Sequence, residues 1–183
     1  MLRSLERQAT SYMALGNETV HMLEYMTSEV AEPFLTPQIV DRLAAMLDYN
    51  LNSLVGPRCT ELKVKNPEKY RFQPRTLLQQ LITVYLNLCK SKEFIQAVAR
   101  DGRSYKKELF SKAANILTKY SLKLNRDVRI LEKFVNDVEE VIKQEEVGEI
   151  LLGDVPDEFL GKRNLINIIC CLFYIIQFKL IFF

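Results

Sequence analysis

One histidine and four cysteines are the side chains of this sequence best suited to metal binding or nucleophilic catalysis. His21 has no second histidine and no cysteine within a few helical turns. The cysteines, which show no Cys-x-x-Cys spacing, are Cys59, Cys89, Cys170 and Cys171. A zinc site needs several such ligands at short spacings, and a serine or cysteine nucleophile needs a base beside it. The sequence therefore predicts neither a metal centre nor an acyl-transfer triad, and we expect His21 to be structural or solvated.

Glycine-rich phosphate loops are also missing from the sequence. Neither Gly-x-Gly-x-x-Gly nor Gly-x-x-x-x-Gly-Lys occurs, and these are the patterns whose backbone N–H groups hold phosphates. We therefore predict no catalytic residue, no cofactor and no metal. A disulfide framework is not expected in a chain with this much apolar core, so the cysteines indicate a reducing, intracellular compartment. Arg3, Glu6 and Arg7 interrupt the N-terminus before the apolar run of a signal peptide could form.

Two clusters of basic residues offer a different chemistry, the binding of anions. They lie at residues 58–75 and 90–112 and contain Arg58, Lys63, Lys65, Lys69, Arg71 and Arg75, then Lys90, Lys92, Arg100, Arg103, Lys106, Lys107 and Lys112. Together they could form a positive surface for RNA or for an acidic protein. An ordinary solvated face explains them more simply, so we predict no nucleic-acid partner. The acid-rich residues 137–149 fit either a neutralising neighbour or the exposed side of a last helix.

Amphipathic helices must position these side chains. Apolar residues that recur at three- and four-residue steps predict helices over residues 1–31, 37–55, 75–90, 92–100, 105–120 and 126–146. The expected N-caps are Thr36, Ser91, Ser104 and Asn125. Pro37 is expected at the first position of the second helix and Gly56 at its end, while Met13 and Met46 are predicted to fill the core. Short turns between successive helices, without a regular repeat, predict an all-α fold: an irregular antiparallel helical stack at the end of an α-solenoid.

The longest stretch before residue 150 without a clean helical period is residues 56–75. It contains three of the six prolines, Pro57, Pro67 and Pro74. Loops of this length inside a compact domain are uncommon and are usually functional or held by packing. Its apolar side chains are Leu62, Val64, Tyr70 and Phe72. We therefore predict that these side chains fasten the stretch against the helical stack.

The composition changes sharply near the C-terminus. Residues 148–160 are extended and acidic, which predicts a linker at 151–160 that leads out of a domain at 1–150. The tail at 161–183 contains three basic residues and no acid, and Lys179 is the one charge after Leu165. One interpretation is a translated intron, because Gly-Lys-Arg is what a read-through splice donor encodes, and we favour it. The alternative is a C-terminal membrane anchor formed by residues 164–183, since about 20 apolar residues span a bilayer.

Several short motifs resemble those of one known family. They are Thr19-Val20 with Met22-Leu23-Glu24-Tyr25, Pro33-Phe34-Leu35, Arg42-Leu43-Ala44-Ala45-Met46-Leu47, Leu54-Val55-Gly56-Pro57, Leu62-Lys63-Val64, Asn66-Pro67-Glu68-Lys69-Tyr70, Phe72 with Pro74, Arg103-Ser104-Tyr105 with Glu108-Leu109-Phe110, and Pro156-Asp157-Glu158-Phe159. Over roughly residues 10–160 the sequence resembles the C-terminal part of the core of the ubiquitin chain-elongation factors. These are the large U-box ubiquitin ligases of the ubiquitin-fusion-degradation pathway.

The resemblance implies an armadillo-like stack of helices followed directly by a U-box. In this family the U-box recruits the ubiquitin-conjugating enzyme and promotes ubiquitin transfer onto chains already begun on a substrate. The sequence departs from the family at Gly161, where the U-box should begin. No conjugating-enzyme contact or catalytic residue can therefore be carried over, and the chain is expected to be truncated before the U-box.

The expected function is accordingly that of a helical scaffold from a ubiquitin–ubiquitin ligase, inactive in transfer by itself. The resemblance implies a role in protein polyubiquitination for proteasomal and endoplasmic-reticulum-associated degradation. It also implies ubiquitin-system proteins and an AAA-type segregase ATPase as partners, in the cytoplasm and the nucleus. One alternative is a tail-anchored helical adaptor that competes with the full-length ligase for partners at a membrane. A third reading, an RNA-binding module, rests only on the basic clusters and would require binding that weakens steeply with salt.

Overall fold

The computed structural model describes residues 2–57, 59 and 64–152. Every regular element within these ranges is helical, which confirms the predicted all-α fold. In chain order the elements are α1 (Leu2–Glu29), η1 (Glu32–Leu35), α2 (Val40–Val55), η3 (Pro67–Tyr70), α3 (Pro74–Leu88), α4 (Lys92–Arg100), α5 (Lys107–Lys119) and α6 (Asn125–Leu152). The labels η1 and η3 denote short 3-10 helices.

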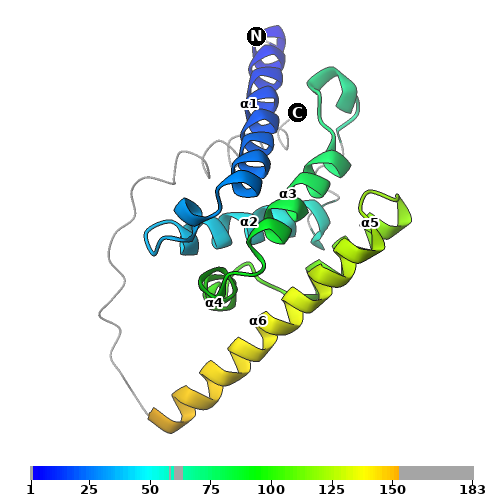
Figure 1. The fold of residues 1–183 in the computed structure, drawn as a ribbon. Helices are drawn as coiled ribbons and strands as arrows, with labels where there is room; N and C mark the ends of the chain where they lie inside the picture. Colours follow the sequence, from blue (N-terminus) through cyan, green and yellow to red (C-terminus); the bar gives the residue numbers. More distant parts are fainter. Residues whose placement is uncertain (1, 58, 60–63, 153–183) are drawn as a thin grey trace.

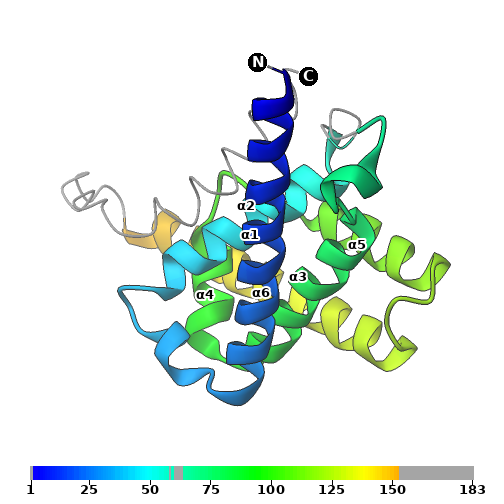
Figure 2. The same ribbon diagram turned by 90° about the horizontal axis from the view of Figure 1, so that it is seen from above.

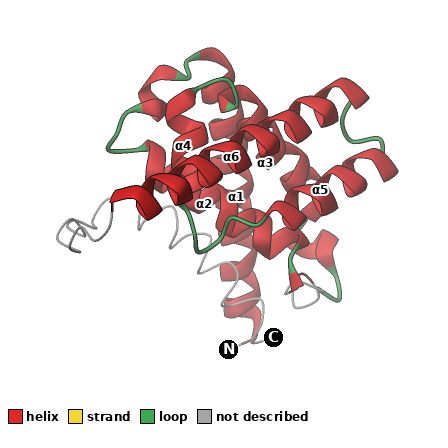
Figure 3. Cartoon of the chain, turned by 90° about the horizontal axis from the view of Figure 1, so that it is seen from below, coloured by secondary structure: helices red, strands yellow, loops and turns green. Residues whose placement is uncertain are grey.

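The helices form a stack in which α1 and the α5–α6 pair lie at opposite ends (Figure 1). The principal packing pairs are α1 with α3, α2 with α4, α4 with α6, and α5 with α6. Seen from above, α1 runs along the near side, and its N-terminal end projects beyond the other helices (Figure 2). Seen from below, α6 is the long helix that crosses the opposite side (Figure 3). The predicted helical stack is therefore confirmed, and α1 packs chiefly on α3 and η3.

The main core is centred on Tyr85 of α3. Its ring lies 5.9 Å from the ring of Phe94, 5.2 Å from that of Phe110 and 6.0 Å from that of Phe134, measured between ring centroids. These partners come from α4, α5 and α6, and all four rings are 2% exposed or less. Aromatic rings bury large apolar areas and favour such tilted or edge-to-face contacts. One aromatic cluster thus joins α3, α4, α5 and α6.

A second, smaller core lies beneath α1. It consists of Met13 and Val20 from α1, Phe72 from the segment before α3, and Leu77 from α3. Met13 is 2% exposed and Met46, in the main core, is 4% exposed. Both methionines therefore fill core positions, as predicted.

The helix starts were predicted with mixed success. Ser91 caps α4, since its hydroxyl accepts the backbone N–H of Phe94 at 3.3 Å. The N-cap predicted at Thr36 is wrong: α2 begins at Val40, and the Thr36 hydroxyl donates back to the carbonyl of Pro33 at 3.1 Å. Pro37 consequently lies in the turn before α2 instead of at its first position.

The last two helices also differ from their predicted starts, but in opposite directions: α5 begins later than predicted and α6 begins earlier. The cap predicted at Ser104 is wrong, because α5 begins at Lys107 with Lys106 as its N-cap residue. Helix α6 begins at Asn125 itself, and the carbonyl of Leu124 accepts the N–H of Asp127 at 2.9 Å. The cap position is thus one residue earlier than predicted, within the usual uncertainty of helix ends.

Gly56 ends α2 as predicted, though not through a left-handed backbone. Its φ of −75° is open to any residue. Its N–H donates to the carbonyl of Asn52 at 2.8 Å, and a Cβ at Gly56 would collide with the carbonyl oxygen and the side-chain oxygen of Asn52. Glycine is required here because the backbone approaches Asn52 so closely.

Helix α6 continues to Leu152, beyond the predicted end at residue 146. The beginning of the stretch at 148–160 is therefore helical, whereas residues 153–160 and the tail at 161–183 lie outside the described residues. Two of the cysteines, Cys170 and Cys171, lie there as well. In the part of the chain that the structure describes, no helix is both long enough and apolar enough to cross a membrane.

Candidate functional site

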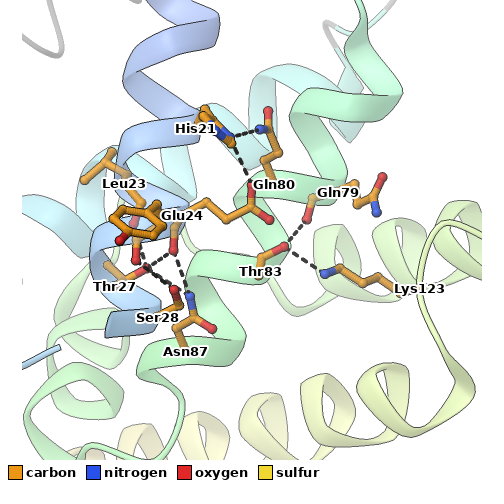
Figure 4. A network of polar contacts seen from close by, with 11 residues as sticks. His21, Leu23, Glu24, Thr27, Ser28, Gln79, Gln80, Thr83, Asn87 and Lys123 are labelled. Carbon is orange, nitrogen blue, oxygen red and sulfur yellow. Dashed lines mark hydrogen bonds and ion pairs between the residues drawn. The ribbon is translucent and has the colours of Figure 1, made fainter. Parts of the chain in front are cut away.

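His21 lies exposed on α1 beside two polar side chains (Figure 4). Its Nδ1 atom is 3.4 Å from Nε2 of Gln80 and 3.9 Å from a carboxylate oxygen of Glu24. Among the residues described, no group of three or more His, Cys, Asp or Glu side chains could hold a metal ion. The arrangement around His21 is a set of surface contacts between α1 and α3, so the candidates for a functional site are the other surfaces of the stack.

Polar contacts fix α1 against α3 (Figure 4). The amide of Asn87 donates to the carbonyl of Glu24 at 3.2 Å and to the hydroxyl of Thr27 at 3.0 Å. The Thr27 hydroxyl itself is buried and donates to the carbonyl of Leu23 at 2.7 Å. Buried polar groups stabilise a packing arrangement only when they are paired, as they are here. The contacts therefore set the position of α1, and with it the orientation of its outer surface.

Residues 64–72, which the structure describes within the segment at 56–75, are fastened beneath α1, as the sequence predicted. Phe72 is 7% exposed and belongs to the core shared by α1 and α3. Val64 and Tyr70 are partly buried and pack against the same core, which confirms them as anchors. Leu62, the fourth predicted anchor, lies outside the described residues.

The turn after η3 has a constrained backbone at Arg71. Its φ of 54° is left-handed, a region that non-glycine residues occupy at some cost in energy. The side-chain amide of Asn17 on α1 donates to the carbonyl of Arg71 at 3.0 Å. The Lys69 ammonium donates to the Glu6 carboxylate at 2.7 Å. These two bonds hold the turn against α1, although both α1 partners come from sequence more than 50 positions away.

An open cleft of about 730 Å³ lies between the N-terminal half of α1 and this turn. Its charged lining consists of Arg3, Glu6, Arg7, Lys69 and Arg71. The structure thus brings two residues of the first predicted basic cluster together with two arginines that the cluster did not include. The α1 arginines were missed because only the fold places them opposite η3.

Two other residues of the basic clusters, Arg75 and Arg100, make contacts within the fold. Arg75 lies over the ring of Tyr120, with its guanidinium carbon 3.7 Å from the ring centroid. Arg100 from the second cluster donates to the Asp41 carboxylate at 2.6 Å. Arg58 and Lys63 lie outside the described residues. The two clusters are therefore partly absorbed by contacts within the fold.

A stripe of apolar side chains is exposed on α1. Leu15 is 45% exposed, Met22 50% and Met26 44%, and Tyr25 and Val30 flank them at 63% and 55%. Leu15, Met22 and Met26 are seven and four positions apart, a spacing that places them on one line of a helix. Met26 and Val30 follow the apolar period that predicts a helix over residues 1–31, but the structure leaves both side chains uncovered. Exposed apolar patches of this kind mark interaction surfaces.

A buried polar contact lies inside the stack, between α2 and α3. The Tyr85 hydroxyl donates to Oδ1 of Asp48 at 2.6 Å, and Asp48 is 1% exposed. Burial raises the pKa of the Asp48 carboxyl well above its ordinary value, and the hydrogen bond from Tyr85 opposes this only in part. The Asp101 carboxyl, at the end of α4, raises that pKa further. Neither the cleft beside α1 nor the one between α5 and α6 is lined by these side chains, and we assign them a structural role.

The described residues define an all-α protein of the irregular helical-stack class, whose end helix carries an exposed apolar stripe and lines a basic cleft. Comparison with known sequences identifies the family. The chain belongs to the ubiquitin elongating factor core family, whose model matches residues 1–139. This finding confirms the resemblance inferred from the motifs.

Several relatives are similar over most of this chain. The ubiquitin conjugation factor E4 of Schizosaccharomyces pombe is 51% identical over 159 residues, which is 87% of this chain and 16% of the relative. The E4 ubiquitin-protein ligase UFD2 of Saccharomyces cerevisiae is 47% identical over 160 residues, 87% of this chain and 17% of the relative. The ubiquitin conjugation factor E4 A of Mus musculus is 34% identical over 164 residues, which is 87% of this chain and 15% of the relative. The chain thus spans about a sixth of the length of these relatives.

Proposed function

We propose that this chain is the helical scaffold of a ubiquitin chain-elongation factor, the part of a U-box ubiquitin ligase that positions other proteins during polyubiquitination. The observation that carries the proposal is the family match over residues 1–139, together with relatives that are named as ubiquitin conjugation factors and ubiquitin-protein ligases. The fold supports it, because a stack of helices offers a rigid framework with open surfaces.

By itself the 183-residue chain carries out no ubiquitin transfer in this proposal. The sequence from Gly161 onward does not resemble a U-box. The described residues hold His21 on the surface, without a nucleophile beside it. Transfer then depends on a U-box supplied elsewhere. The helical stack holds that U-box in position relative to the substrate and the growing chain.

The pathway and the partners follow from the resemblance to the family. We propose that the scaffold acts in proteasomal and endoplasmic-reticulum-associated degradation, with ubiquitin-system proteins and an AAA-type segregase ATPase as partners, in the cytoplasm and the nucleus. The relatives named as ubiquitin conjugation factors support the ubiquitin-system part of this proposal. Co-precipitation of the segregase with this chain from cell extract tests the segregase part of the proposal. The control is a variant in which the exposed residues of α1 are exchanged with one another.

A chimera tests the scaffold proposal directly. Residues 1–160 of this chain replace the matching segment of the S. pombe relative, and the chimera is given activating enzyme, conjugating enzyme, ubiquitin and a mono-ubiquitinated substrate. We expect chain extension by the chimera and none by the 183-residue chain alone. Extension by the isolated chain would contradict its inactivity, and a folded chimera without activity would contradict the scaffold role.

A second candidate function is a tail-anchored helical adaptor that competes with the full-length ligase for partners. The observation that favours it is the apolar run from Leu165 to Phe183, which includes a single charged residue, Lys179. Carbonate extraction of cell membranes separates the two candidates. An anchored adaptor stays in the membrane pellet and leaves it when residues 164–183 are deleted, whereas a scaffold without an anchor is extracted in both forms.

A further inference from the structure

The cleft between α1 and the η3 turn carries positive charge that the fold does not neutralise. Among the residues that the structure describes, Glu6 is its one acidic lining residue, and the Glu6 carboxylate is paired with the Lys69 ammonium at 2.7 Å. The side chains of Arg3, Arg7 and Arg71 make no hydrogen bond or ion pair with any residue that the structure describes. All three are exposed. Three guanidinium groups therefore face the solvent around a single cleft, free to bind anions.

The spacing of these groups suits carboxylates carried on a peptide. Arg3 and Arg7 are one helical turn apart on α1, so their side chains follow each other along one face at about 6 Å. Arg71 faces them from the other wall. Each guanidinium can bind a carboxylate with two parallel hydrogen bonds, which is the strongest form of this contact. An extended or helical segment with several Asp or Glu residues could therefore engage two or three arginines at once.

The two walls of the cleft are fixed before any ligand arrives. Asn17 binds the carbonyl of Arg71, Lys69 binds Glu6, and the ring of Phe72 is buried directly behind the turn. The left-handed backbone at Arg71 directs the chain from η3 back toward α3. Binding to a preformed site costs little ordering of the protein, so the charges can contribute to affinity more fully.

We propose that this cleft binds an acidic peptide segment of a partner protein. An acidic peptide fits better than a nucleic acid because, among the residues that the structure describes, the lining of the cleft contains no aromatic ring. Proteins that bind single-stranded nucleic acids stack the bases on aromatic side chains. The proposal extends the scaffold function by naming one surface and the chemistry of its partner, and it does not depend on ubiquitin transfer.

Fluorescence anisotropy with the 183-residue chain tests the proposal. The probe is a fluorescein-labelled octaglutamate peptide, compared with octaglutamine and with a thymidine oligonucleotide of equal charge. We expect octaglutamate to bind, and to bind more tightly than the oligonucleotide. Its affinity should fall about tenfold when salt is raised from about 50 to 300 mM. The double variant Arg7→Glu, Arg71→Glu should lose about tenfold or more in affinity.

A matched control makes the result specific to the cleft. The double variant Lys65→Glu, Arg129→Glu changes the net charge equally at two exposed residues that do not line the cleft. We expect its affinity to stay within about twofold of the unmodified chain, and melting temperatures check that both variants fold. Equal losses in the two double variants, no binding of octaglutamate, or tighter binding of the oligonucleotide would each overturn the proposal.

Discussion

The two ends of the helical stack are built differently. Around Tyr85 the body is closed: aromatic rings from α3, α4, α5 and α6 contact one another, and each is 2% exposed or less. The α1 layer is more open. It rests chiefly on a smaller core that includes Met13 and Phe72, with Leu23 reaching the main core, and it leaves Met22 and Met26 about half exposed.

This difference separates the part of the molecule that sets its stability from the part that can bind partners. Helices in proteins gain most of their stability from the packing of their apolar face, and α1 packs chiefly on α3 and η3. We therefore expect α1 to depend on the body, whereas the body depends little on α1. The same openness leaves the basic cleft and the apolar stripe accessible to partners.

The largest effect is expected from a substitution in the closed body. Phe134→Ala removes a ring that contacts Tyr85, Phe94 and Phe110 in a fully packed core. We expect the free energy of unfolding in urea to fall by about 3–5 kcal/mol. Leu124→Ala, at a side chain that is 67% exposed, is the control and should change it by less than about 0.5 kcal/mol. Equal effects of the two substitutions would remove the distinction between a closed and an open region.

A smaller loss is expected beneath α1. Phe72→Ala empties one side of the second core, which can partly collapse because α1 has few other neighbours. We expect a loss of about 2–3 kcal/mol in the same measurement. Tyr70→Ala, at a ring that is only partly buried, should cost less than Phe72→Ala. A larger cost for Tyr70 than for Phe72 would show that the segment at 56–75 is held by its surface contacts instead of its buried ring.

The buried carboxyl of Asp48 makes the stability of the body depend on pH. Its folded-state pKa is raised, first by burial, above the unfolded value of about 3.9. The stability contributed by the protonated carboxyl is complete below the unfolded pKa and declines as the pH rises toward the folded pKa. Asp48→Asn cannot ionise, so its stability relative to the unmodified chain should increase with pH, by at most about 1.4 kcal/mol per pH unit.

Urea titrations over a series of pH values measure this difference. Asn136→Gln, at an exposed residue of α6 that carries no ionisable group, serves as the control and should give a difference that is nearly independent of pH. A stability difference for Asp48→Asn that stays constant or decreases as the pH rises would contradict the assignment of a buried, protonated carboxyl. The protonated state would then no longer explain how the closed body accommodates the buried Asp48 carboxyl.

The smallest effect is expected on the exposed stripe of α1. Met22→Gln replaces a side chain that is 50% exposed on the outer surface, so little buried apolar area is lost. We expect the free energy of unfolding, derived from the melting temperature, to change by less than about 0.5 kcal/mol. A loss above about 1 kcal/mol would show that this surface is covered in solution, and that the α1 layer is less open than described.

Much of the fold could be predicted from the sequence. The apolar periodicity located every helix that the structure describes from α1 to α6, and Ser91 was identified as a cap because a short apolar pattern follows it directly. The anchors in residues 56–75 were predicted because apolar side chains in a proline-punctuated segment need a surface to cover. Thr36 and Ser104 were predicted wrongly, since a hydroxyl near a helix start can bond elsewhere, as Thr36 does with Pro33.

The candidate site was harder to predict. Periodicity shows which side of α1 is apolar, but it does not show which neighbours are present to cover Met26 or Val30. The basic cleft combines Arg3 and Arg7 with Lys69 and Arg71, and only tertiary packing brings these together. Asp48 could have been noticed, because it lies on the buried face of α2 between Ala44 and Leu51. Its partner Tyr85 comes from another helix, which no local pattern reveals.

Native-state hydrogen exchange of the full chain, read by mass spectrometry, tests the central claim most directly. The account predicts that amides of α1 exchange through local opening, with an opening free energy at least about 2 kcal/mol below that of amides in α3 and α6. Phe72→Ala should lower the protection of α1 while leaving the difference between α3 and α6 unchanged. If α1 amides exchange only through the same global unfolding as the body, the stack has one cooperative unit and the separation into a closed body and an open layer is contradicted.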